Sequence, residues 1–133
     1  MTDREVLLQY RLREARETLE DAQKMTAVGV ATRSIVNRAY YALFYAVLAL
    51  FLRFDVNPKT SKHTGIVAIF DRDFVHTGRA DVQLSKILHR LFELRQQSDY
   101  RELTTISREE AAAAVDDARR FVDAIERLIA TSE

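Results

Sequence analysis

The chain has 133 residues, in which 20 Lys and Arg balance 20 Asp and Glu, with three glycines, one proline and no cysteine. A chain of this length fits one domain, and so few turn-forming residues exclude a many-stranded sheet protein and favour long helices. The lack of cysteine excludes disulfides, and the balanced charge excludes a uniform field that draws the whole chain onto nucleic acid. We therefore expect a single all-α domain over residues 1–133.

The first predicted helix begins after Thr2, which forms a capping-box pattern with Glu5, and ends at Gly29. Between them, apolar residues recur at spacings of three and four, which is the signature of one buried face of a helix. These residues are Leu8, Leu12, Ala15, Leu19 and Ala22.

The second predicted helix covers about residues 31–54 and is apolar nearly all round after Arg38. Its uncharged run, residues 39–52, has 14 residues and is too short to span a bilayer, so we expect a helix in the middle of the domain. The start of the chain has no basic stretch followed by an apolar core, so we expect no signal peptide and a cytoplasmic protein.

A loop over residues 55–60, with Pro58, precedes a short helix over about residues 61–75, and Gly78 ends this helix. A fourth helix is predicted over residues 82–99, a linker over residues 100–106, and a long last helix behind a second capping box, Ser107 and Glu110. The inward positions are Ile66, Ile69, Phe70 and Phe74 in the short helix, and Leu84, Ile87, Leu88 and Leu91 in the fourth.

These elements predict an antiparallel up-and-down bundle of four main helices plus one short helix, because short connections make neighbouring helices antiparallel. The start of the second helix then meets the end of the fourth, which brings Asn37 and Arg38 toward Arg95 and Tyr100. Arg95 follows Leu91 by four residues on the inward stripe, where an unpaired charge is costly. It should therefore bind a buried partner or line a cleft.

Three stretches carry a resemblance to a known family: "NRAYYALFYAVLALF", "KHTGIVAIFDRDFVHTG" and "LHRLFELRQQSDYRE". Together they resemble the HEPN family (higher eukaryotes and prokaryotes nucleotide-binding domain), in its branch of small stand-alone prokaryotic proteins, over about residues 31–129. The resemblance implies an all-α bundle that is usually a homodimer and binds RNA or nucleotide. Many relatives are ribonucleases or toxin components, often encoded beside a minimal nucleotidyltransferase that acts as antitoxin.

In ribonuclease members of the family, an arginine is followed four to six residues later by a histidine, and a polar residue near the start of the second helix assists. Arg95 and Asn37 match two of these positions, but Tyr100 stands where the histidine is expected. Tyrosine, with a pKa of about 10, is a poor base, whereas Asp99 could serve as one. The resemblance implies Arg95, Asp99 and Tyr100 as catalytic candidates, and the binding candidates are Asn37, Arg38, Tyr41, Lys62 and His63.

Each candidate has a purely structural alternative. Arg95 and Asp99 could form only an i,i+4 ion pair on the helix surface. Asn37, Arg38, Tyr41 and Tyr45 could be core or dimer-interface residues. Lys62 and His63, at the start of the short helix, could attract an anion or simply lie on a solvated surface. His63, His76 and His89 lie 13 residues apart, which matches no common zinc pattern, so we expect neither a metal site nor a cofactor.

The sequence leaves two classes of function open. The first is a toxin-like, ribonuclease-related protein whose shared cleft binds RNA or nucleotide, and the second is a non-catalytic dimeric interaction module. Because the second helix has more apolar sides than one bundle covers easily, we expect Tyr41, Tyr45 or Phe51 to pack across a two-fold axis. Relatives with a tyrosine near the motif can receive nucleotide groups from the partner enzyme, which makes Tyr100 a candidate for modification.

Overall fold

The computed structural model describes residues 1–100 and 105–131, and within these ranges it contains helices and no strand. This confirms the predicted all-α class. The linker prediction falls partly on residues 101–104, which lie outside the described residues. The elements are α1 (Asp3–Val28), α2 (Thr32–Arg53), α3 (His63–Phe70), the π-helix η1 (Asp71–Val75), α4 (Val82–Ser98) and α5 (Arg108–Thr131).

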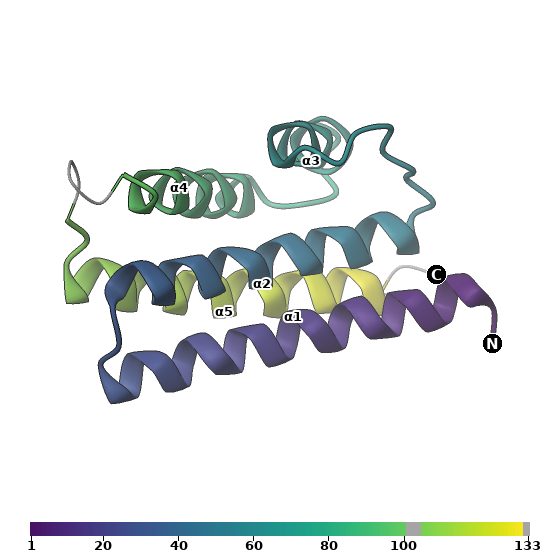
Figure 1. The fold of residues 1–133 in the computed structure, drawn as a ribbon. Coiled ribbons are helices and arrows are strands. Elements are labelled where there is room, and N and C mark those ends of the chain that lie inside the picture. Colours follow the sequence, from purple (N-terminus) through teal and green to yellow (C-terminus); the bar gives the residue numbers. More distant parts are fainter. Residues whose placement is uncertain (101–104, 132–133) are drawn as a thin grey trace.

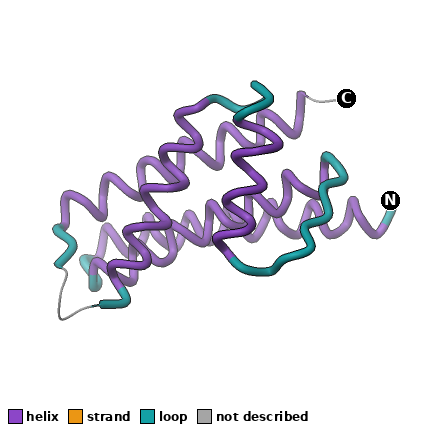
Figure 2. Tube along the Cα trace, turned by 90° about the horizontal axis from the view of Figure 1, so that it is seen from above, coloured by secondary structure: helices purple, strands orange, loops and turns teal. Residues whose placement is uncertain are grey.

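The four long helices alternate in direction, as the sequence predicts for an up-and-down bundle. Figure 1 shows α2 in the middle, with α1 running antiparallel along one side and α4 returning over the other, while α5 runs back beside α1 and α2. The start of α2 and the end of α4 consequently lie at the same end of the molecule. Figure 2 shows that the short α3–η1 segment lies across the direction of the long helices rather than along it.

The predicted helix ends are confirmed by their hydrogen bonds. Thr2 Oγ1 accepts a hydrogen bond from the Glu5 amide at 3.1 Å, and Gly29 ends α1 with a left-handed φ of 77° that favours glycine. At the start of α5, the Ser107 amide donates to Glu110 Oε1 at 3.1 Å, and the Glu110 amide donates to Ser107 Oγ at 3.0 Å. The complete capping box at Ser107 and the single side-chain cap at Thr2 therefore set the starts of two long helices.

Helix α2 forms the centre of the core, as its apolar sequence indicates. By length and composition it could cross a membrane, but 61% of its most apolar window is buried inside the bundle. The central helix of a bundle passes the same test, and α2 is covered by α1, α4 and α5. The residues of α2 that are fully buried or nearly so are Ile35, Val36, Ala39, Tyr40, Ala42, Leu43, Ala46, Val47, Ala49, Leu50 and Phe51.

The structure differs from the prediction at the short helix, which was expected to run regularly over residues 61–75. It is an α-helix only as far as Phe70, and a π turn follows, with the His76 amide donating to the Asp71 carbonyl at 2.8 Å. The carboxylate of Asp71 is tied to α4, because it accepts from Ser85 Oγ at 2.7 Å and pairs with His89. The spacing of the apolar residues did not reveal this turn, since Phe70 and Phe74 are buried in either geometry.

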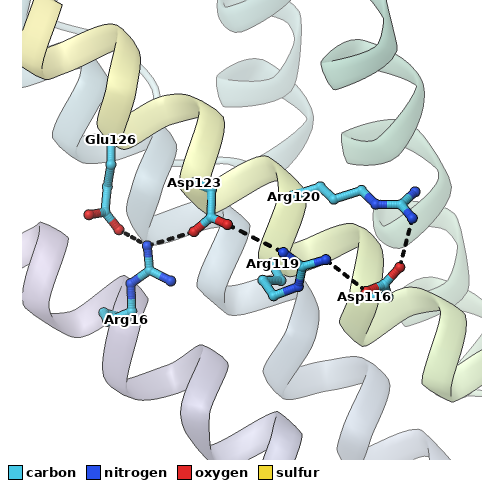
Figure 3. A network of polar contacts seen from close by, with 6 residues as sticks. All are labelled: Arg16, Asp116, Arg119, Arg120, Asp123 and Glu126. Atoms are coloured by element: carbon cyan, nitrogen blue, oxygen red, sulfur yellow. Dashed lines mark hydrogen bonds and ion pairs between the residues drawn. The ribbon is translucent and has the colours of Figure 1, made fainter.

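A network of charged side chains joins the outer faces of the helices around α2. Arg16 on α1 pairs with Asp123, at 3.0 Å, and with Glu126 on α5, and Arg119 extends the network along α5 (Figure 3). Arg90 on α4 pairs with Asp117 on α5 at 3.0 Å. Because these side chains are partly exposed, each pair contributes only modestly to stability, but together they fix how α1 and α4 lie against α5.

Candidate functional site

Arg95, in the last turn of α4, points toward α2 rather than into solvent. Its guanidinium carbon lies 5.5 Å from the ring centroids of both Tyr40 and Tyr41, a distance at which a cation is attracted to an aromatic face. Its Nε is buried without a hydrogen-bond partner among the described residues, and no carboxylate of that part of the chain lies within ion-pair distance. The alternative of a surface ion pair with Asp99 is therefore not what the structure shows.

Tyr40, on α2, contacts both Arg95 of α4 and His63 of α3. Its side chain is completely buried, and its hydroxyl lies 2.8 Å from Nδ1 of His63, the first residue of α3. Burial raises the pKa of Tyr40 well above its ordinary value, and the nearby Arg95 charge only partly opposes this shift. The hydroxyl of Tyr40 therefore keeps its proton at any physiological pH.

The imidazole of His63 is held by rings from α2. It stacks on Phe44 with ring centroids 4.1 Å apart and an angle of 9° between the planes, and it also stacks on Tyr40 at 5.6 Å. Burial lowers the pKa of His63 from its ordinary value, and the positive charge of Arg95 lowers it further. His63 is therefore neutral at pH 7. We call Arg95, Tyr40, Tyr41, Phe44 and His63 the Arg95 cluster.

A second group of predicted residues lies in a separate pocket of about 420 Å³ at the end of the bundle. Arg38 in this pocket pairs with Asp21 on α1 at 3.2 Å, so part of its charge is already neutralised. Arg95 is not among the residues that form the wall. The lining residues are Met25, Arg33, Ser34, Asn37, Arg38, Ser98 and Asp99.

The structure thus divides the predicted site in two. Arg95, Tyr41 and His63 come together in the Arg95 cluster, whereas Asn37, Arg38 and Asp99 share the neighbouring pocket. The structure places the side chains of Tyr100, which is 66% exposed, and Lys62 on the surface.

Two members of the cluster, Tyr40 and Phe44, were not predicted as site residues. The run "YYALFY" contains both, but a helix that is apolar on every side does not reveal which of its rings faces an arginine on another helix. The three histidines do not come together. His63 bonds Tyr40, His89 pairs with Asp71, and His76 is exposed.

Comparison with known proteins gives the family. The model of the HEPN domain matches residues 8–128. A UPF0332 protein of Thermotoga maritima is 43% identical over 129 residues, which cover 97% of this chain and 96% of the relative. Two proteins of Methanocaldococcus jannaschii also match. "Putative toxin MJ0605" is 35% identical over 97 residues, covering 73% of this chain and 70% of the relative. "Putative toxin MJ0142" is 40% identical over 76 residues, covering 57% and 50%. This bundle, with its arginine at the end of α4, therefore belongs to the HEPN domain family.

Proposed function

We propose that this protein binds RNA or a nucleotide through a phosphate held by Arg95, and that it is a toxin-like, ribonuclease-related HEPN protein. The observation that carries the proposal is a guanidinium held against two tyrosine rings, with no carboxylate partner among the described residues. A planar guanidinium that is positioned and unpaired is well suited to a phosphate group, which offers it two oxygen acceptors.

The neighbouring pocket contains the other polar side chains that we propose to contact the nucleotide. Asn37 offers an amide that can hydrogen bond to the same nucleotide, and Asp99 is the candidate base for cleavage at a 2′-hydroxyl. Tyr100, which follows Asp99 in the chain and is mostly exposed, is the candidate hydrogen-bond donor and the residue that a partner enzyme could modify.

Two relatives of this chain carry the name "Putative toxin", which supports a toxin-like role with an antitoxin partner. We propose a minimal nucleotidyltransferase as the antitoxin partner, on the basis of the family resemblance. The identity of the neighbouring gene product is the observation that tests this assignment, because an unrelated neighbour speaks against it.

We also propose that the protein is a homodimer. One face of α2 is only partly covered by the other helices, and it carries Tyr41, Phe44, Tyr45, Leu48 and Leu52. The prediction that Phe51 belongs to the interface was wrong, because Phe51 is 2% exposed and stacks on Phe74 in the core. Light scattering at micromolar concentration tests the dimer, with Leu48→Glu as the variant expected to dissociate it.

The test of the site compares Arg95→Ala with Arg90→Ala. Both substitutions remove one positive charge from α4, but Arg90 pairs with Asp117 on the outer surface. Binding and cleavage of a labelled oligoribonucleotide are measured for each variant at several salt concentrations, because phosphate contacts are weakened by salt. We expect Arg95→Ala to lose binding and Arg90→Ala to retain it. Equal binding by the two variants, or none by the wild type, contradicts the proposed function.

The second candidate function is a non-catalytic dimeric interaction module. The observation that favours it is that no histidine follows Arg95 in α4 and that Tyr100, in its place, is mostly exposed. Co-purification with the neighbouring gene product, together with no effect on RNA, selects this alternative.

A further inference from the structure

The hydrogen bond between Tyr40 and His63 determines which imidazole nitrogen carries the proton. The Tyr40 hydroxyl lies 2.8 Å from Nδ1 and has no other hydrogen-bond partner in the described part of the chain. Since this buried hydroxyl keeps its proton, it donates to Nδ1. A neutral imidazole has a single N–H, so in His63 that hydrogen lies on Nε2.

The Nε2–H group of His63 is left as a donor without a protein acceptor. It lies on the side of the ring away from Nδ1, and no hydrogen bond of Nε2 is formed within the described residues. The His63 ring and the Arg95 guanidinium both lie against the rings of Tyr40 and Tyr41, and the charge of Arg95 acts on the His63 ring. The cluster thus combines an unpaired imidazole N–H donor with a guanidinium that has no carboxylate partner within the described residues, which is complementary to an anion with several oxygens.

We propose that His63 and Arg95 jointly bind one phosphodiester group, and that Tyr40 is the positioning residue that holds the imidazole in its Nε2–H form. This inference rests on the proposed function and deepens it, because it names the second residue that contacts the phosphate. It also assigns His63 a binding role at neutral pH rather than that of a general base, since its one nitrogen without a proton, Nδ1, already accepts the hydrogen bond of Tyr40.

The joint site has a defined pH dependence. On acidification His63 takes up a proton at Nδ1, turns that hydrogen bond around so that it donates to Tyr40, and keeps Nε2–H as a donor that now carries charge. The groups that face this ring are Arg95 from α4 and Tyr40 and Tyr41 from α2, with Lys62 beside it in the chain. Histidine is the side-chain type whose ordinary pKa lies between pH 5 and 8, and a phosphodiester stays ionised throughout this range. A rise in affinity over this range is therefore specific to His63.

The experiment uses the dinucleotide uridylyl-(3′,5′)-uridine, whose single phosphate is a diester, and follows its binding to the full chain by NMR at pH 7.5 and 5.5. We expect the long-range ¹H–¹⁵N spectrum of the free protein to show the proton of His63 on Nε2 at pH 7.5. The affinity of the wild type should rise by about threefold or more at pH 5.5, because a charged donor makes a stronger hydrogen bond.

Three variants separate the roles. His63→Gln keeps an amide donor near the place of Nε2, so it should bind at pH 7.5 but lose the pH dependence. His63→Leu should bind more weakly at both pH values. Tyr40→Phe should show both tautomers and intermediate affinity. Circular dichroism of each variant confirms that the bundle is folded.

The outcomes are distinct. If Arg95→Ala abolishes binding while His63→Leu binds as the wild type does, the inference is overturned and the proposed function stands. A proton on Nδ1 of His63 at pH 7.5 also overturns the inference alone. If the wild type binds neither the dinucleotide nor a longer oligoribonucleotide, the proposed function fails and the inference fails with it.

Discussion

Replacement of Tyr40 by phenylalanine removes one hydroxyl group and leaves the ring that packs against Arg95. The structure shows a single hydrogen bond of this hydroxyl, to His63 Nδ1 at 2.8 Å, and a side chain with no exposed surface. Loss of one such hydrogen bond costs about 0.5–1.5 kcal/mol of net stability, since Nδ1 of the partly buried His63 can then bond to water. Removal of the whole ring in Tyr40→Ala also leaves a cavity and should cost about 3–5 kcal/mol.

The measurement is urea unfolding at a fixed protein concentration, because a dimer's stability depends on concentration. With a slope of about 2 kcal/mol/M, a loss of about 1 kcal/mol lowers the midpoint by about 0.5 M. Tyr41→Phe is the matched control, since Tyr41 also lies beneath Arg95 but its hydroxyl makes no hydrogen bond within the described residues. If both variants shift the midpoint equally, or neither shifts it, the reasoning about the Tyr40–His63 bond is refuted.

Three further predictions concern the segment that carries His63 and the bundle around it. In Gly65→Ala the new Cβ would overlap with Cγ2 of Thr60, so we expect the free energy of unfolding, measured by thermal unfolding, to fall by about 1–3 kcal/mol, and Thr60→Ala should partly restore it. Because the pKa of His63 is lowered in the folded protein, the unfolded chain binds the imidazole proton more tightly than the folded chain does. The wild type should therefore lose stability relative to His63→Gln as the pH falls from about 6.5 through the folded pKa. If the difference between the urea midpoints of the two proteins is the same at pH 7.5 and at pH 5.5, the pKa shift is contradicted. Arg16→Met removes both bonds between α1 and α5, and should cost about 1 kcal/mol at low salt and less at high salt, as measured by urea unfolding.

The absence of a histidine after Arg95 changes how the site must work if it cleaves RNA. His63, the first residue of α3, lies in the Arg95 cluster, but its Nδ1 accepts a hydrogen bond from Tyr40 and its pKa is lowered. The neutral imidazole can therefore act toward RNA as a hydrogen-bond donor through Nε2–H. A base would then have to come from Asp99 in the neighbouring pocket or from a second copy of the chain. Binding without cleavage by the isolated protein is consistent with this arrangement.

The sequence by itself determined the helices and most of the core. Capping residues such as Thr2 and Ser107 specify their helix starts through local hydrogen bonds, and apolar periodicity is a property of one helix at a time. It also indicated that Arg95 points inward, because this arginine continues the stripe of Leu91. Such features depend only on residues that are close in the chain, which is why they can be read without a structure.

Only the tertiary structure decided what Arg95 meets. Its partners Tyr40 and Tyr41 lie more than 50 positions earlier, on a helix that is apolar all round, and His63 arrives on a short helix that crosses the bundle. The position of that helix depends on the path of the loop before it and on the bonds of Asp71 to Ser85 and His89 of α4, and these bonds join residues that are far apart in the chain. The predicted site was therefore divided into a cluster and a pocket by helix packing, which no single segment encodes.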